Sequence, residues 1–565
     1  MFCQEPLEQP IEEGGWGVSP CFRTGVILLL ILLLGASLRL YKLDQISPPG
    51  LNQDEAANAW SAYCILKTGK DYAGVSWPIF YTRNVGANVS TLYVYLLIPF
   101  QVIGGLNVYT TRLPAALAAV FNIWVIYFVG KRLFNTQIGI AAAALLAIDP
   151  WDIQHSRWGH EASIVPFLSL APLALMLWAN MPVSNSKTIS PRPFAAALAG
   201  ALTGICCYSY YTVRLFVPVL LFLTVLFTLS NWRQGIKTPK GLLAIAAFFI
   251  AFAAFYGPLI WLHIFHPEGI SRHFLFSPNR INNVPLPDAV KNVAIRYIQH
   301  FGPYFLFIEG DSHPVLSPPG IGQFYWYMLP LMLAGLISII RRFKSSPSAR
   351  VILAFVVAYP AGDCVVWGSG LSILRSAPGL CGLLLLAAVG AVEAFRWMRL
   401  KSRKAASTIT TFFAVVVIAS NIWYFHYFFG EFSRKLSVYT FFQTDLVEAC
   451  KWLKPRLNDF DAIFFTTESF NMPHVTTAVA LGYDPEKWFN EPRDFTTVGE
   501  YDYYTRYGKM YFMYGQPIEP ILKSLPPNPR ILVIVRPEEE LEGNPNIVHT
   551  IYAPEGIPTL LILKR

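Results

Sequence analysis

The chain has 565 residues, of which 54% are hydrophobic and only 14% carry a charge. A soluble domain has about 25% charged residues, so this composition excludes an ordinary soluble protein. The formal net charge is +9, but the basic residues stand in short clusters between apolar segments. They make no continuous basic face, which excludes a nucleic-acid-binding surface.

Long apolar segments account for the low charge. A membrane-spanning helix needs roughly 17–25 predominantly apolar residues. The first such segment follows an acidic leader and lacks a small-residue cleavage site, so it is interpreted as a membrane anchor and not as a cleavable signal. The sequence predicts a polytopic α-helical membrane protein with about 11 transmembrane helices, at 25–41, 114–130, 137–150, 163–180, 194–211, 214–230, 242–262, 324–340, 350–367, 372–393 and 408–428.

Segment 91–106, with the sequence TLYVYLLIPFQVIGGL, is a twelfth apolar candidate. If it does not cross, the basic clusters near 131, 187–192, 233–240, 341–344 and 396–404 all fall on the same side as Arg23. An excess of Lys and Arg marks the cytoplasmic side of a membrane. We therefore predict that 91–106 lies in the external interface and that the N-terminus is cytoplasmic.

This topology defines the predicted domains. Residues 1–24 form a cytoplasmic segment, and 25–428 form the transmembrane domain with external loops 42–113, 151–162 and 263–323. Residues 429–565 are less apolar, with helix-like stretches at 443–457 and 473–482 and strand-like runs at 461–466, 531–536 and 558–563. That alternation predicts a small C-terminal α/β domain outside the cytoplasm. The protein is expected in the plasma or inner membrane.

The first external loop contains Asn52-Gln53-Asp54-Glu55 before a helix-like stretch. Asn52 and Glu55 have the spacing of a capping box, in which each side chain bonds the other residue's backbone N–H. Such a box leaves the carboxylate of Asp54 without a role. A carboxylate at this place, just outside the first span, can act as a general base toward a hydroxyl.

The second external loop, from Asp149 to Ala162, crowds two histidines, an arginine and several carboxylates into a short connection. It is interpreted either as a polar interfacial loop with belt tryptophans or as part of a site. His155, His160 and Glu161 could bind a divalent metal, although no spacing compels that interpretation. Arg157 is the residue best suited to a lipid phosphate, because a guanidinium binds phosphate oxygens in a bidentate manner.

The third external loop, 263–323, is long and rich in proline, and it contains Arg272, His273, Arg280, Arg296, Asp311 and His313. Long loops in compact proteins are often lids or binding loops. We therefore predict that this loop closes over the site.

Four features resemble the GT-C glycosyltransferases, in the branch that contains the protein O-mannosyltransferases and the lipid A aminoarabinose transferase. They are Asp54-Glu55, the segment from Arg112-Leu113-Pro114 to Arg132-Leu133-Phe134, Ser156-Arg157, and the loop 263–323 ending in Pro319-Gly320-Ile321-Gly322-Gln323-Phe324-Tyr325. The likeness is best over 37–180, weaker to about 395 and absent after 430.

The resemblance implies a membrane enzyme that takes a sugar from a polyprenyl-phosphate donor on the external face. It implies Asp54 as the base and Arg157 as a contact to the donor phosphate, with Glu55, Glu161 and His155 as supporting candidates. One departure concerns Glu161, which stands four residues after the arginine where the mannosyltransferases have an aspartate at five. No cofactor is predicted, and the acceptor class stays open between protein, lipid and polysaccharide.

Two alternatives belong to other classes. A polytopic transporter or lipid flippase would place ionisable groups near the middle of its spans. Here the spans are nearly free of Asp, Glu and Lys in their middles, and the acidic groups gather in the external loops. A non-catalytic envelope assembly protein with a sensor domain is the third interpretation.

Overall fold

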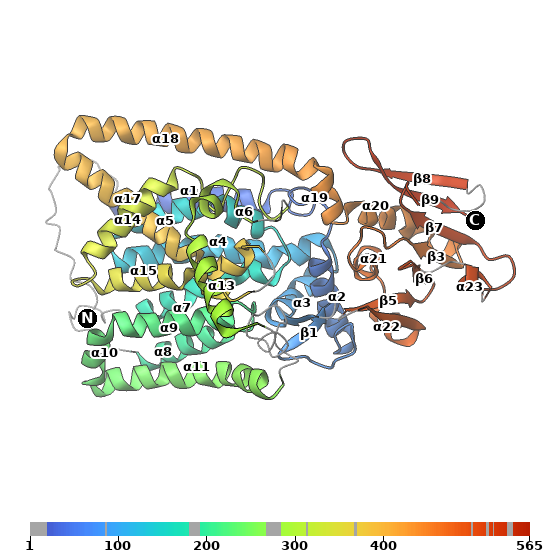
Figure 1. Cartoon of the computed structure of the whole chain (residues 1–565), viewed down its shortest axis with the longest axis horizontal. Coiled ribbons are helices and arrows are strands. Elements are labelled where there is room, and N and C mark those ends of the chain that lie inside the picture. Colours follow the sequence, from blue (N-terminus) through green and yellow to red (C-terminus); the bar gives the residue numbers. More distant parts are fainter. Residues whose placement is uncertain are drawn as a thin grey trace. The chain divides into compact units, whose positions relative to one another are not determined.

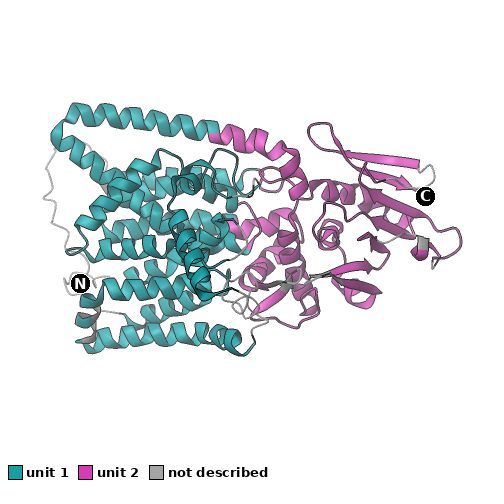
Figure 2. Ribbon diagram, in the orientation of Figure 1, with its two compact units in different colours: residues 1–41, 116–156, 161–423 teal, residues 42–115, 157–160, 424–565 magenta. Residues whose placement is uncertain are grey.

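In the computed structural model, the described residues are 20–84, 87–179, 192–266, 284–311, 313, 315–366, 370–498, 501–515, 519–523, 525–539 and 546–565. The chain forms two compact units, shown in different colours in Figure 2. Unit 1 comprises Met1–Tyr41, Ala116–Ser156 and Glu161–Trp423. Unit 2 comprises Lys42–Ala115, Arg157–His160 and Tyr424–Arg565.

Unit 1 is built from helices, many of which run alongside one another in Figure 1. Their bounds are α1 Pro20–Leu40, α4 Val108–Leu133, α5 Thr136–Ala147, α6 Pro150–His155, α7 Val165–Ala179, α8 Pro193–Cys206, α9 Val213–Phe227, α10 Leu229–Ile236, α11 Pro239–Phe265, α13 Leu286–Gln299, α14 Met328–Arg341, α15 Pro347–Ala358, α16 Ile373–Ser376, α17 Leu380–Lys401 and α18 Arg403–His426. Residues 108–115 of α4 and 424–426 of α18 fall in unit 2.

Local sequence explains where several of these helices begin. At α11, Thr238 accepts a hydrogen bond from the N–H of Gly241 at 3.1 Å, and Pro239 occupies the first helical position. The Ser346-Pro347 pair opens α15 in the same way. A hydroxyl cap satisfies a donor that the first turn leaves unpaired, and proline has no such donor to lose.

Each predicted span coincides with a helix, so the helical membrane fold is confirmed. Among the described residues, six helices are long and apolar enough to cross a membrane: Cys21–Leu40, Val108–Leu133, Glu161–Ala179, Pro239–Phe265, Ile373–Lys401 and Arg403–Arg434. The remaining spans match apolar helices of 10–17 residues. The total of eleven crossings therefore stays a prediction.

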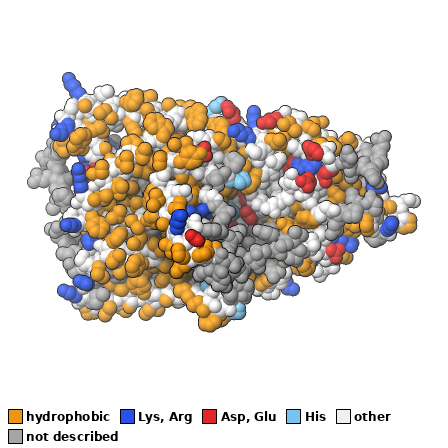
Figure 3. Space-filling model, in the orientation of Figure 1, with side chains coloured by type: hydrophobic (Ala, Val, Ile, Leu, Met, Phe, Trp, Pro, Cys, Tyr) orange, Lys and Arg blue, Asp and Glu red, His pale blue; other side chains and the backbone are white. Residues whose placement is uncertain are grey.

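Several basic linkers of unit 1 meet at one of its ends. Arg342 pairs with Glu393 at 2.7 Å, and Arg396 donates to the side chain of Gln137 at 2.9 Å. Figure 3 shows Lys and Arg side chains at this end, at the left of the view, beside a surface of hydrophobic side chains. The prediction that the clusters near 131, 341 and 396 share one side agrees with these contacts.

The structure groups the first external loop with the C-terminal region, whereas the sequence assigned it to the transmembrane domain. The reason is a shared apolar core. Trp60 on α2 (Gln53–Thr68) packs edge-on against Trp488 at 5.6 Å between ring centroids. The indole N–H of Trp488 donates to the carbonyl of Tyr72 at 2.9 Å. Helices α20 and α21 contribute further side chains to the same core.

The C-terminal region of unit 2 contains a seven-stranded mixed sheet with strand order β4-β5-β6-β3-β7-β9-β8. The strands are β3 Ala462–Phe465, β4 Arg493–Val498, β5 Tyr501–Tyr507, β6 Met510–Phe512, β7 Ile531–Val535, β8 Asn546–Tyr552 and β9 Pro558–Lys564. The helices are α19 Leu436–Phe441, α20 Thr444–Leu453, α21 Pro473–Leu481, α22 Pro485–Asn490 and α23 Glu519–Leu522. β3 runs parallel to both β6 and β7, which makes this a mixed α/β domain as predicted.

Segment 91–106 forms α3, Leu92–Gly104, which follows the hairpin of β1 Tyr81–Asn84 and β2 Ala87–Ser90. Its 13 residues reach about 20 Å, short of the roughly 30 Å of hydrocarbon that a crossing needs. Because the predicted spans at α5 and α15 are equally short, this length does not separate α3 from them, and its interfacial placement stays a prediction. In loop 263–323, the described part contains α13 and a π-helical turn at Tyr304–Ile308, while Arg272, His273 and Arg280 lie outside the described residues.

Candidate functional site

The predicted capping box forms at the start of α2. The side chain of Asn52 accepts from the N–H of Asp54 at 2.7 Å, and Glu55 Oε2 accepts from the N–H of Asn52 at 3.1 Å. Asp54 takes part in this cap through its backbone, and its side chain is half-buried. Consecutive helical residues point about 100° apart, so the two carboxylates face different directions.

Glu55 is the centre of a buried ion pair. Its Oε1 and Oε2 accept from Nε and Nη2 of Arg112 at 2.8 and 2.9 Å, and Oε1 also accepts from the N–H of Gly159 at 2.7 Å. With the bond from Asn52, the carboxylate of Glu55 accepts four hydrogen bonds. Both side chains are nearly inaccessible, at 1% and 0% exposed. Glu55 therefore has a structural role, and its carboxylate is not open to a substrate.

Arg112 is saturated as well. Besides Glu55, its guanidinium donates to the carbonyls of Leu43, Pro48 and Gly50 at 3.1, 2.8 and 2.8 Å. All five N–H groups of an arginine are thereby used. The Glu55–Arg112 pair joins the start of α2 to the start of α4, and the other bonds of Arg112 hold the loop between the first span and α2. The sequence motif pointed to Arg112 only as part of the family likeness.

Arg157 is also fully buried. It donates through Nε to the carbonyl of Ser47 at 2.8 Å and through Nη2 to those of Ile46 and Lys42 at 2.7 and 3.3 Å. The guanidinium lies over the ring of Phe429, 5.2 Å from its centroid. Burial, followed by the nearby charge of Arg112, lowers the pKa of Arg157 to about 9, which still leaves it charged at neutral pH. These hydrogen bonds are all to backbone carbonyls, and the ring contact is to Phe429.

The two remaining predicted residues lie in unit 1. His155 ends the short helix α6 and is buried with its ring 4.8 Å from that of Trp151. Glu161 opens a 3-10 turn, Glu161–Ile164, and is 6% exposed. Across the described residues, no group of three His, Cys, Asp or Glu side chains is arranged to hold a metal ion.

Sequence reasoning missed a charge cluster around Asp363 in unit 1. The carboxylate of Asp363 accepts from His300 Nε2 at 2.9 Å, from Arg296 Nη2 at 3.2 Å and from Nε of Arg375. His300 Nδ1 lies 2.7 Å from the carbonyl of Arg296. Two arginines thus surround one carboxylate, so the cluster has a surplus of positive charge. His300 and Arg296 lie 63 and 67 residues before Asp363 in the sequence, so local sequence patterns do not indicate the cluster.

A second ion pair that the sequence did not reveal joins α1 to the start of α6. Arg39 donates through Nη2 to Asp152 at 2.5 Å and to the carbonyl of Leu146 at 2.8 Å. The side chain of Asp149 caps α6 by accepting from the N–H of Asp152 at 2.9 Å. These carboxylates of the second external loop are therefore used in holding unit 1 together.

Comparison with solved structures shows the fold class. The chain is similar to ArnT from Cupriavidus metallidurans in the apo state, with a TM-score of 0.53, 12% identity, and coverage of 97% of this chain and 98% of that chain. For the same enzyme bound to undecaprenyl phosphate, the TM-score is 0.52 and the identity 11%, with 96% and 97% covered. The archaeal oligosaccharyltransferase AglB from Archaeoglobus fulgidus, in complex with an inhibitory peptide and a dolichol-phosphate, has a TM-score of 0.48 and 14% identity over 81% and 64% of the chains. At that score it adds nothing to the assignment. No curated protein sequence matches the chain.

The fold of the chain is thus similar to that of ArnT over nearly the whole length of both chains. Residues 89–261 match the model of the dolichyl-phosphate-mannose-protein mannosyltransferase family. This match covers about a third of the chain and agrees with the resemblance that the loops indicated. It favours a glycosyltransferase over the transporter or flippase interpretation.

Proposed function

We propose that the chain transfers a sugar from a polyprenyl-phosphate donor to an acceptor hydroxyl on the extracytoplasmic face, with inversion at the anomeric carbon. Two findings support the donor class. The family model names a dolichyl-phosphate sugar, and the similar ArnT was solved with undecaprenyl phosphate bound. Both are lipid phosphates, and such a donor resides in the bilayer that the long apolar helices of this chain can cross.

The observation that carries the residue assignment is the contrast between two neighbouring carboxylates. Glu55 is committed to four hydrogen bonds and an ion pair. Asp54 gives its N–H to the cap and is partly exposed, whereas the side chain of Glu55 is 1% exposed. We therefore assign Asp54 as the general base and Glu55 as the residue that positions it. Because the base must meet a hydroxyl, partial exposure suits Asp54 and excludes Glu55.

In the proposed step, Asp54 takes the proton of the acceptor hydroxyl while the hydroxyl oxygen attacks the anomeric carbon. The bond from that carbon to the phosphate oxygen breaks, and the polyprenyl phosphate leaves with the electron pair. Attack opposite to the leaving group inverts the configuration. The leaving phosphate gains negative charge, so a fixed cation near it lowers the barrier.

Two sets of arginines are candidates for that cation. Arg157 is the residue that the sequence predicts, but its bonds to Ser47 and Ile46 would have to be exchanged for a phosphate. The second set is Arg296 and Arg375, whose side chains are 14% and 15% exposed beside Asp363. Donor binding by alanine variants distinguishes the two candidates. If Arg157 holds the phosphate, only Arg157→Ala should lose donor binding. If Arg296 and Arg375 hold it, only Arg296→Ala and Arg375→Ala should lose donor binding.

Replacing Asp54 tests the function. Asp54→Asn should lower the transfer rate by about 10²-fold or more, the usual contribution of a general base, with donor binding nearly unchanged. The readout is mass spectrometry of lipid and glycan pools from cells with and without the protein, followed by transfer assays with the sugar so identified. Asp494→Asn, an exposed carboxylate on β4, is the control. Near-normal transfer by Asp54→Asn, or a product that keeps the donor's anomeric configuration, contradicts the assignment.

A further inference from the structure

One loop of unit 2 presents an uncharged, strongly apolar surface. Residues 72–82 read YAGVSWPIFYT and contain no Asp, Glu, Lys or Arg. Within this stretch Val75, Trp77 and Ile79 are 46%, 62% and 67% exposed. Large apolar side chains gathered in this way on a surface mark a partner or a membrane. We call residues 72–82 the apolar loop.

The apolar loop has a defined backbone. Its first turn is closed by Asp71, whose side chain accepts from the N–H of Val75 at 2.8 Å and whose N–H donates to the carbonyl of Val75 at 2.9 Å. The N–H of Trp77 donates to the carbonyl of Gly69, the residue that ends α2, at 2.9 Å. The three apolar side chains are therefore held outward by hydrogen bonds at the base of the loop.

The loop continues into a second apolar surface on α3. The hydroxyl of Thr91, at the start of α3, donates to the carbonyl of Ile79 at 2.6 Å. The outward face of α3 carries Leu96, Pro99, Val102 and Ile103, and the helix contains no charged residue. Only residues 105–107 separate α3 from Val108, which begins α4, one of the helices long and apolar enough to cross the membrane. The apolar face of α3 therefore lies where the chain enters the bilayer. Figure 1 shows α2, α3 and β1 side by side.

We propose that the apolar loop is a second membrane anchor, which inserts Val75, Trp77 and Ile79 into the interfacial layer of the bilayer beside α3. The partner is the phospholipid surface because the loop is uncharged, is followed in the chain by a membrane-entering helix, and exposes Trp77, a residue type that favours the interface. A surface that binds a soluble protein would instead be expected to contain polar groups as well.

The anchor has a consequence for the helix that carries Asp54. The first turn of α2 is fixed by Glu55 and Arg112, and its last residue, Thr68, is followed by Gly69, which bonds Trp77. The 16 residues of α2 span about 24 Å. The loop thus sets the depth of one end of α2 relative to the lipid headgroups. The anchor itself does not depend on the proposed reaction.

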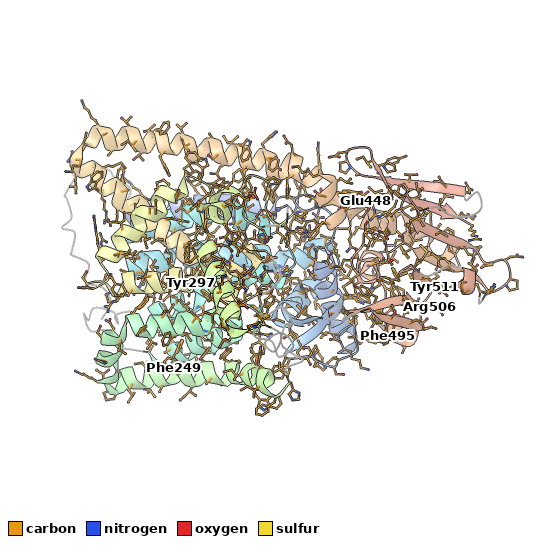
Figure 4. All side chains as sticks on the ribbon, in the orientation of Figure 1. Phe249, Tyr297, Glu448, Phe495, Arg506 and Tyr511 are labelled. Atoms are coloured by element: carbon orange, nitrogen blue, oxygen red, sulfur yellow. The ribbon has the colours of Figure 1, made fainter. Side chains whose placement is uncertain are left out.

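Depth measurement by spin labelling tests the anchor. Single cysteines at positions 75 and 79, in a chain with Cys3 and Cys21 replaced by serine, carry a nitroxide in nanodiscs of phosphatidylcholine and phosphatidylglycerol. The other cysteines are buried. Labels at 75 and 79 should be relaxed more by membrane-soluble oxygen than by a water-soluble nickel chelate. Phe495 on β4, labelled in Figure 4 and 63% exposed, is the aqueous control, and Leu30 on α1, 60% exposed, is the membrane control.

Three outcomes are possible. Oxygen-dominated relaxation at 75 and 79, as at Leu30, supports the anchor. Nickel-dominated relaxation, as at Phe495, overturns it. Labels shielded from both reagents mean that another protein surface covers the loop, which also overturns it. Because position 77 is left unchanged, Trp77 keeps its bond to Gly69 in both variants. Photocrosslinking from position 79 to lipid provides a second readout if a cysteine variant does not fold.

Discussion

Removing Arg112 should be among the most damaging single changes in unit 2. Arg112→Leu deletes five donors at once and leaves Glu55 as an uncompensated charge that is 1% exposed. Three carbonyls, of Leu43, Pro48 and Gly50, lose their partner as well. Breaking a buried ion pair on one side costs about 3–5 kcal/mol. For a unit of this size, 1 kcal/mol shifts the unfolding midpoint by roughly 2–4 °C.

The expected shift is therefore about 6–20 °C, measured by differential scanning fluorimetry of the purified protein in detergent micelles. Arg530→Leu is the matched control, because Arg530 pairs with Asp461 at 3.0 Å where both side chains are largely exposed. An exposed pair of this kind contributes little. Equal shifts for the two variants would refute the central role of the Glu55–Arg112 pair. Transfer activity in Arg112→Leu should fall even below the new unfolding midpoint, since Asp54 would lose its fixed position.

Two further predictions concern the C-terminal region. Burial lowers the pKa of His474 to about 3, so the folded domain keeps this ring neutral while the unfolded chain takes up a proton below about pH 6.5. Acidification from pH 7.5 to 5 should therefore lower the free energy of unfolding of the domain by about 2 kcal/mol. The variant His474→Phe should lose this pH dependence. Identical pH profiles of the unfolding midpoint for the two proteins would contradict the prediction. A reporter that is active only in the cytoplasm, fused after Arg565, should give no signal, because only α18 separates the tail from the basic linker 396–404; a strong signal would reverse the topology.

The membrane helices were predictable because hydrophobicity alone defines them. Runs of apolar residues at 25–41 or 242–262 have no alternative to a helix once they are in lipid, where every backbone group must be paired within the segment. The buried strands β3, β7 and β9 were predicted for a similar reason, as short apolar runs. Strand β8 was not predicted, because its first four residues are exposed at the sheet edge and do not alternate between buried and exposed positions. β5 contains four tyrosines and no simple apolar pattern.

The features that the sequence did not predict depend on contacts between residues far apart in the chain. The pairing of Trp60 with Trp488, which brings the first external loop into the C-terminal unit, joins residues more than 400 positions apart. Nothing in the local sequence of α2 indicates this partner. In the same way, the spacing of Asn52 and Glu55 predicted the capping box. The ion pair of Glu55, in contrast, depends on Arg112, which is 57 residues away.

Asp54 and Glu55 differ in the same way, because Asp54 contributes to a local helix cap whereas Glu55 also pairs with the distant Arg112. Two adjacent carboxylates would repel each other, and the second negative charge would be harder to keep ionised. Arg112 removes this conflict, because it neutralises Glu55 inside the protein and leaves Asp54 as the one carboxylate of the pair that is partly exposed. A base needs both properties, a negative charge and a path to the hydroxyl. Glu55 alone could not act as the base, since four hydrogen bonds already occupy it, and Asp54 alone would sit on a helix start with no fixed position. The buried cation is therefore as necessary to the proposed chemistry as the base, although it never meets the substrate.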